Sequence, residues 1–246
     1  MLRTLFAPLT LALFTLGTAH GAGPERLSID HDDARIEARC RGDAAHPLIV
    51  LLHGLGGYER FAASYDAYAD LLAGAGWRAC AVLYYSGDDA AVMTKSDQAT
   101  RDAHRERRFG VWAGAVAKAV DELSDGHDAG VLGFSQGGYL AVAVAGRQPK
   151  VRAVAEFYGG IPRWGAPKIE RLPPTLILHG EADAVVPVAQ ADALAAFVRE
   201  RSGEVTIRRY AGADHGFDFD WSSAPAVDAR QRVVAFFGRQ LELNAR

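Results

Sequence analysis

Apolar residues along this chain follow two kinds of pattern. Short apolar runs recur, separated by longer stretches in which apolar residues return every three or four positions. Leu48–Leu52 is a continuous apolar run, typical of a strand covered on both faces, whereas Arg35–Cys40 alternates as a half-buried strand does. Further strands are expected at Ala79–Tyr85, Ala129–Phe134, Val151–Tyr158, Thr175–Leu178 and Val205–Tyr210. Helices are expected at Arg60–Ala73, Arg108–Leu123, Gly137–Gly146, Ala189–Arg201 and Ala226–Leu241.

The alternation of strands with helices predicts an α/β fold. Such βαβ units give a mostly parallel sheet with helices on both faces. We find no Ser/Pro linker and no repeat, so residues 22–246 are expected to form a single domain. The connection Gly159–Pro174 holds four prolines and three glycines, and Ser86–Arg107 reads as a polar loop with one short helix. No helical cap domain is therefore expected over the carboxyl ends of the strands.

The first 21 residues have the pattern of a signal peptide. Arg3 precedes the apolar stretch Leu5–Leu16, and the small residues Gly17, Ala19 and Gly21 follow, as a signal peptidase requires. The apolar stretch is shorter than the roughly 20 residues that span a bilayer. We expect an exported protein, periplasmic or secreted, with no stable membrane anchor. The alternative is a buried N-terminal helix.

Composition and charge exclude several classes of protein and of binding partner. The chain has 246 residues, of which 49% are hydrophobic and 23% charged, as in ordinary globular proteins. This composition excludes collagen, coiled coils, disulfide scaffolds and disordered proteins. Lys and Arg total 27 against 30 Asp and Glu, so the net charge of −3 gives no reason to expect nucleic acid as a partner. The oligomeric state stays open.

The segment Gly133–Gly137 has the pattern G-x-S-x-G, with Ser135 at its centre. It follows an expected strand and precedes an expected helix, the context in which a nucleophilic serine stands on a sharp turn. The alternative is a glycine-rich turn without catalytic function.

A serine nucleophile needs a base, and the base needs an orienting carboxylate. His215 lies in a glycine-flanked loop after the last expected strand, and Asp183 follows the strand that ends at His179. We therefore expect Ser135, His215 and Asp183 to form a catalytic triad. Three other acids compete for the orienting role: Glu156, Glu181 and Asp214. The remaining histidines of the mature chain that lie in polar connections are expected at the surface: His31, His46, His104 and His127.

An oxyanion hole needs two backbone N–H donors. One is expected from Gln136, directly after the nucleophile. The other is expected from Leu55, with Gly56 next, in the loop after Leu48–Leu52. His53 is interpreted as a structural residue that hydrogen-bonds beneath this loop.

These motifs together resemble the dienelactone hydrolase family of α/β-hydrolases. The segments HGLGG, GFSQGG, EFYGG, LHGEADAVVP and YAGADHGF carry the resemblance, which runs from about Leu48 to Leu241. The chain order Ser135, Asp183, His215 is the order of that superfamily. GFSQGG also resembles the corresponding segment of acyl-protein thioesterases and related carboxylesterases.

The chain departs from the family pattern at three positions. The founding enzymes use a cysteine nucleophile where this chain has Ser135, and a glutamate where it has His53. Their substrate-binding arginine just beyond the catalytic histidine has no counterpart here. The arginines within Arg105–Arg108 could supply another anion contact, but a solvated helix start is the interpretation we prefer.

The expected activity is hydrolysis of a small carboxylic ester or lactone by an exported serine hydrolase without a cofactor or metal. A pocket wall is expected from Phe157, Tyr158, Trp164, Phe217 and Trp221. The alternatives are an acyl thioesterase or carboxylesterase of the same fold, a non-catalytic exported binding protein and a metal hydrolase. No H-E-x-x-H segment supports the last.

The resemblance also bears on Cys40 and Cys80, the two cysteines of the chain. In the related fold, the strand that carries Cys40 lies antiparallel to the strand that carries Cys80. A disulfide is therefore possible in an exported protein. Two buried free thiols are the alternative.

Overall fold

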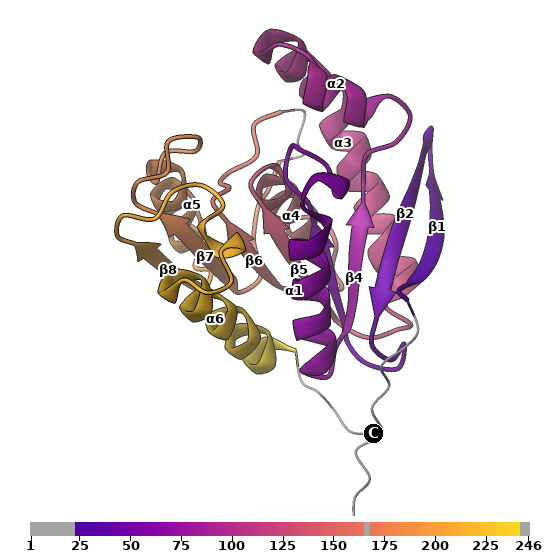
Figure 1. Ribbon diagram of the computed structural model, residues 1–246. Coiled ribbons are helices and arrows are strands. Elements are labelled where there is room, and N and C mark those ends of the chain that lie inside the picture. The colour runs from indigo at the N-terminus through magenta and orange to yellow at the C-terminus, as the bar shows by residue number, and fades with distance from the viewer. Residues whose placement is uncertain (1–22, 165–167, 242–246) are drawn as a thin grey trace, which may run out of the picture.

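The structure is a computed structural model that describes residues 23–164 and 168–241. Its strands form one eight-stranded sheet in the order β1-β2-β4-β3-β5-β6-β7-β8 (Figure 1). The expected signal peptide, residues 1–21, lies outside the described residues. Strand β2 pairs antiparallel with β1 and β4, and the other neighbours are parallel. The strands are β1 (Glu25–His31), β2 (Ala34–Arg41), β3 (Leu48–Leu52), β4 (Arg78–Leu83), β5 (Ala129–Phe134), β6 (Val151–Phe157), β7 (Thr175–Gly180) and β8 (Val205–Tyr210). The predicted mostly parallel α/β sheet is confirmed.

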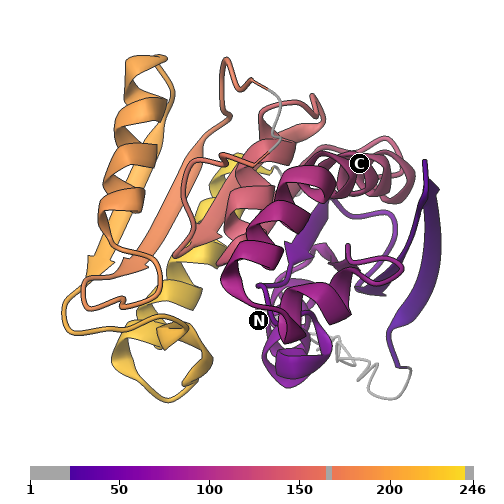
Figure 2. The same ribbon diagram turned by 90° about the horizontal axis from the view of Figure 1, so that it is seen from above.

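Helices cover both faces of the sheet (Figure 2). One face packs on α1 and α6, around Tyr68 and Phe237, and the other on α3, α4 and α5, around Trp112 and Leu140. Strands β3 and β5 lie between these two layers and are buried along their whole length, which explains their continuous apolar sequences. The helices are α1 (Ala62–Gly74), α2 (Asp89–Lys95), α3 (Gln98–Leu123), α4 (Gln136–Ala145), α5 (Ala189–Glu200) and α6 (Ala224–Gln240).

The segment Ser86–Arg107 contains more helix than the one short helix expected in it. It contains α2 and the first ten residues of α3, which begins at Gln98, where the side chain of Asp97 accepts a hydrogen bond from the Thr100 amide at 2.8 Å. Figure 1 shows α2 and the start of α3 beyond the carboxyl ends of the strands. Between β6 and β7, the described residues contain no helix. No helix of the described chain is long and apolar enough to cross a membrane.

The two cysteines form a disulfide between neighbouring strands. Cys40 of β2 lies directly opposite Cys80 of β4 in the antiparallel register, with the Cα atoms 4.0 Å apart, and the sulfur atoms are bonded. The alternative of two free thiols does not hold in this structure. The bond ties the β1–β2 hairpin at the sheet edge to the parallel strands.

Candidate active site

Ser135 lies in the turn between β5 and α4, at the carboxyl edge of the sheet. Its backbone has φ 55° and ψ −118°, a conformation that favours glycine. Two glycines leave space for this turn. A Cβ atom at Gly133 would overlap the carbonyl of Gly137, and one at Gly137 would overlap the carbonyl of Leu52. The hydroxyl therefore stands at the start of α4, on a strained turn.

His215 brings its imidazole to this hydroxyl from the loop after β8. Its Nε2 lies 2.9 Å from Ser135 Oγ, and its Nδ1 lies 2.8 Å from Asp183 Oδ2. The carboxylate accepts only, so Nδ1 carries the hydrogen and Nε2 accepts from the serine. These three side chains form one continuous hydrogen-bonded chain.

Asp183 is buried and held by its own loop. Its Oδ1 accepts hydrogen bonds from the amides of Val185 and Val186, at 2.8 and 2.7 Å. His179 lies beneath the loop, where burial lowers the pKa of its imidazole, and its Nε2 donates to the Val186 carbonyl at 2.8 Å. The loop therefore holds Asp183 through Oδ1, which leaves Oδ2 for the contact with His215.

The other three acids do not contact the His215 ring. Glu181 is exposed, and Glu156 is wholly buried, with Oε2 accepting from the Gly159 amide. Asp214 accepts from the Ala184 amide and from the backbone amide of His215. Asp183 is the acid that the structure brings to the imidazole.

Leu55 and Gln136, the two expected oxyanion donors, both line the cavity in front of Ser135. Gln136 is the first residue of α4, where a helix leaves its amides unpaired. In the facing loop, the Gly54 carbonyl accepts from His53 Nδ1 at 2.8 Å and from the Gly57 amide at 3.1 Å. The carbonyl and amide of a trans peptide unit point in opposite directions. These bonds therefore also fix the direction of the Leu55 amide.

The Gln136 side chain connects the two halves of this site. Its Oε1 accepts from Arg105 Nε at 2.9 Å, and its Nε2 donates to the Tyr85 hydroxyl at 2.7 Å. The Tyr85 hydroxyl in turn donates to the Leu55 carbonyl at 3.1 Å. The expectation that Arg105 belongs to a solvated helix start is wrong. Because α3 begins early, Arg105 is buried at the cavity instead.

A cavity of about 780 Å³ opens in front of Ser135, within the range typical of small-molecule sites. Of the five expected wall residues, Tyr158 and Trp164 line it. Phe157 does not, because it faces the core beneath α1 and α6, stacked on Phe134 at 5.1 Å between ring centroids. Phe217 packs on Tyr210, and Trp221 packs edge-on against Tyr68, so these two also lie outside the lining.

The aromatic lining comes mainly from residues that sequence patterns did not single out: Phe61, Tyr65, Phe134, Tyr139 and Phe219. The lining also contains four arginines, Arg60, Arg101, Arg105 and Arg163, but no Asp or Glu among the described residues. The guanidinium groups of Arg105 and Arg163 each lie 5.0 Å from the Trp164 ring. Arg105 is already paired, because its Nη1 donates to Asp102 Oδ1 at 2.6 Å. The lining nevertheless carries more positive than negative side chains, although the whole chain has a net charge of −3.

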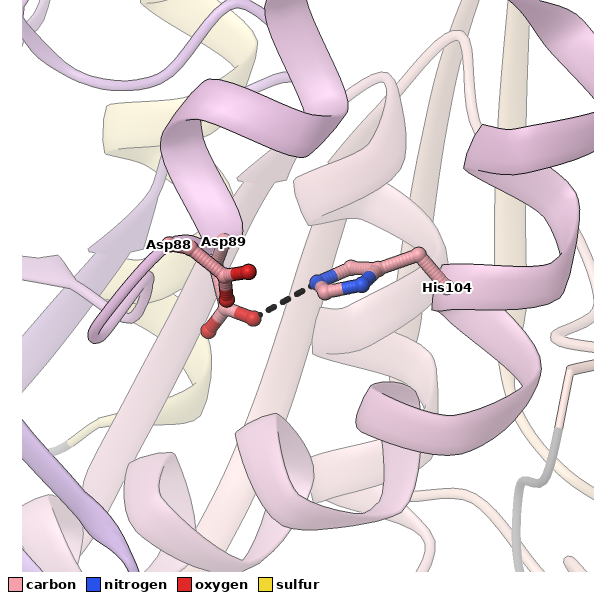
Figure 3. Close-up of side chains that lie close together, drawn as sticks. All are labelled: Asp88, Asp89 and His104. Atoms are coloured by element: carbon pink, nitrogen blue, oxygen red, sulfur yellow. Dashed lines mark hydrogen bonds and ion pairs between the residues drawn. The ribbon is translucent and has the colours of Figure 1, made fainter. Parts of the chain in front are cut away.

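One cluster beside the cavity has ligand types that metals prefer: Asp88, Asp89 and His104 (Figure 3). His104 was expected at the surface but is buried, and its Nε2 lies 2.7 Å from Asp89 Oδ1. That carboxylate also accepts from Trp112 Nε1 at 2.8 Å and Arg108 Nε at 3.1 Å. Burial raises the pKa of Asp89, but hydrogen bonds from Ser86, Trp112 and His104 outweigh it and lower the pKa. The donors already occupy the carboxylate, so the cluster anchors α2 to α3.

The comparisons with known proteins identify the family and the fold of the chain. The sequence profile of the dienelactone hydrolase family matches residues 36–241. A carboxymethylenebutenolidase homolog of Rattus norvegicus is 25% identical over 233 residues, covering 90% of this chain and 93% of that protein. A Synechocystis sp. protein, named provisionally as a carboxymethylenebutenolidase, is 32% identical over 128 residues, 47% of this chain. The match spans about half, 52%, of that relative's length.

Solved structures share the fold. The dienelactone hydrolase from Anabaena variabilis superposes with a TM-score of 0.69 at 19% identity, covering 90% of this chain and all of that one. An acylaminoacyl peptidase from Pyrococcus horikoshii gives a TM-score of 0.70 at 16% identity, covering 91% of this chain but 42% of that one. Identities this low show a common fold and leave activity to be argued from the site.

Proposed function

Because the chain belongs to the dienelactone hydrolase family, we propose that it is an exported serine hydrolase that cleaves a small carboxylic ester or lactone. The observation that carries this proposal is the hydrogen-bonded chain from Ser135 through His215 to Asp183. A binding protein would have no need for a serine on a strained turn, aligned with a base and a buried carboxylate.

Ser135 Oγ attacks the substrate carbonyl while His215 Nε2 takes its proton. Asp183 keeps the hydrogen on Nδ1 and stabilises the charged imidazole that forms. The tetrahedral oxyanion accepts hydrogen bonds from the amides of Leu55 and Gln136. His215 then gives the proton to the leaving oxygen, and an acyl-enzyme remains on Ser135.

Water completes the reaction. His215 removes a proton from the water as it attacks the acyl-enzyme, and returns that proton to Ser135 Oγ as the ester bond breaks. An ester releases an acid and an alcohol, and a lactone releases a hydroxy acid. A thioester would react by the same steps, which keeps the thioesterase alternative within this mechanism.

A fluorophosphonate probe tests the nucleophile. We expect labelling of the wild-type protein, loss of labelling in Ser135→Ala, and loss of ester hydrolysis in the same variant. A wild-type protein that is not labelled and turns over no ester would favour the non-catalytic binding protein instead.

The arginine-rich lining supports a substrate that carries an acidic group in addition to the reacting carbonyl. Hydrogen bonds to charged groups contribute about 1.5–3 kcal/mol each. The described lining residues include no Asp or Glu, and of the lining arginines Arg105 is paired with Asp102 outside the lining. We expect 4-nitrophenyl hemisuccinate to exceed 4-nitrophenyl pentanoate in kcat/KM by about tenfold. In Arg163→Gln this preference should fall, whereas it should persist in Arg171→Gln, a matched change away from the cavity.

Export is supported by the sequence of residues 1–21 and by the disulfide between Cys40 and Cys80, since such bonds persist in oxidising compartments. Cell fractionation followed by N-terminal sequencing tests it. We expect the mature chain to begin after Ala19 or Gly21. Recovery of the uncleaved chain from the cytoplasm would refute export.

A further inference from the structure

Asp218 is a wholly buried carboxylate that the proposed triad does not use. It lies in the short helix η2 (Phe217–Phe219), three residues after His215. Its Oδ1 accepts from the Tyr158 hydroxyl at 2.6 Å, and its Oδ2 accepts from the Tyr68 hydroxyl at 2.9 Å. Burial raises the pKa of Asp218 to about 6, although both hydroxyls oppose the rise. Burying a carboxylate costs free energy unless hydrogen bonds compensate, and the two tyrosine hydroxyls supply such bonds to Asp218.

Tyr158 is the residue that joins Asp218 to the active site. It directly follows β6 and has φ 44°, in the left-handed region that a bulky side chain rarely adopts. Its amide donates to the Leu178 carbonyl at 2.9 Å, so the strained conformation is held from β7. The ring lies against the imidazole of His215, with the two ring centroids 4.4 Å apart and the ring planes tilted by 53°. Strain that surrounding bonds enforce beside a catalytic group is a sign of function.

We propose that Tyr158 and Asp218 act as positioning residues that hold the His215 imidazole at the angle proton transfer requires. This role rests on the proposed serine hydrolase function. Hydrogen bonds at Nδ1 and Nε2 fix two points of the ring but leave it free to tilt about the line between them. The Tyr158 ring blocks that tilt on one side.

The hydrogen bond to Asp218 keeps the Tyr158 ring in place. Asp218 belongs to the same loop as His215, so this bond ties the loop to the end of β6. The pKa of the Tyr158 and Tyr68 hydroxyls is raised by burial, so both remain donors. Arg230, whose guanidinium lies 4.1 Å from the Trp221 ring, lowers the pKa of Asp218 by its charge.

Tyr68 provides a matched control. Its hydroxyl also donates to Asp218, but its ring packs on Phe134 and Trp221 and does not line the cavity. Tyr158→Phe and Tyr68→Phe each remove one donor to the same carboxylate. A purely structural role for Asp218 predicts that the two variants lose similar stability and keep the same kcat.

The experiment measures kcat, KM and thermal midpoint for both variants with one chromogenic ester. We expect similar drops in thermal midpoint for both variants and a KM within twofold of wild type. The kcat should be about tenfold lower in Tyr158→Phe alone, because small misplacements of catalytic groups reduce turnover strongly. Asp218→Ala should lose kcat to at least the same extent. Asp218→Asn, whose amide oxygen still accepts from Tyr158, should recover most of it.

Equal kcat values in Tyr158→Phe and Tyr68→Phe would overturn the positioning role, as would a loss confined to KM. An Asp218→Asn variant no better than Asp218→Ala would do the same. These outcomes differ from a failure of the proposed function. In that case the wild-type protein itself would neither hydrolyse esters nor react with a fluorophosphonate, and the role of Tyr158 would fall with it.

Discussion

Glu156 makes the stability of this protein depend on pH in a direction unusual for a carboxyl group. It is fully buried on β6, its Oε2 accepts from the Gly159 amide at 2.6 Å, and its Oε1 has no hydrogen-bond partner among the described residues. Burial raises the pKa of Glu156 from 4.5 to about 8, although the Gly159 amide opposes the rise. The carboxyl is therefore protonated in the folded protein at neutral pH.

The magnitude follows from linkage between protonation and folding. Below pH 4.5, Glu156 is protonated in both the folded and the unfolded chain, and it imposes no penalty. Between pH 4.5 and 8, the unfolded chain loses the proton while the folded chain keeps it, so the free energy of unfolding falls by about 1.4 kcal/mol per pH unit. The loss amounts to about 3 kcal/mol at pH 7 and about 5 kcal/mol at pH 8 and above.

The perturbation is Glu156→Gln, which keeps the shape and an acceptor for the Gly159 amide but cannot ionise. Urea unfolding at pH 5, 6, 7 and 8, without reductant, gives the free energy at each pH. We expect the variant to gain on wild type as pH rises, by about 3 kcal/mol or more between pH 5 and pH 8. In Glu181→Gln, at an exposed site, the free energy of unfolding should change with pH in parallel with wild type. If the free energy of unfolding of Glu156→Gln also changed with pH in parallel with wild type, the raised pKa of Glu156 would be refuted.

Two further predictions concern the triad and the disulfide. Ser135→Ala and His215→Ala should each lower kcat by roughly three to six orders of magnitude, and Asp183→Asn somewhat less. Near-normal turnover by purified Ser135→Ala would contradict the assignment. Replacing both Cys40 and Cys80 by alanine should lower the free energy of unfolding by about 3 kcal/mol, since the bond closes a long loop, and urea titration without reductant measures it. Two alkylatable thiols in unreduced, denatured wild-type protein would contradict the bond.

The central strands β3 and β5 could be predicted from sequence because burial on both faces leaves no polar position in them. β3 and β5 begin and end as expected. β1 was not expected, although Leu27 and Ile29 alternate with polar residues. The start of α3 was missed because Gln98–Arg107 is polar on most sides and has no apolar period. Asp97, whose side chain caps this helix, was the available signal.

The contact between Ser135, His215 and Asp183 could be predicted because these residues follow strand ends that meet at one edge of the sheet. The pocket wall could not be predicted in the same way, because the backbone turns sharply after β6, with φ 44° at Tyr158, and the sequence does not show this turn. Phe157 and Tyr158 are adjacent, yet one lies in the core and the other lines the cavity. Arg105 reaches the cavity only because α3 extends past the sheet, which no local pattern around the arginine indicates.

The strained turn at Ser135 has a consequence for the evolution of this position. A glycine at this position would adopt φ 55° and ψ −118° without the cost of about 1–3 kcal/mol that a side chain incurs there. On the proposed function, Ser135→Gly would therefore abolish turnover while relieving this strain. Among descendants that no longer need the reaction, loss of the nucleophile would meet no structural resistance. On the proposed function, selection for turnover is what keeps a serine in this strained backbone conformation.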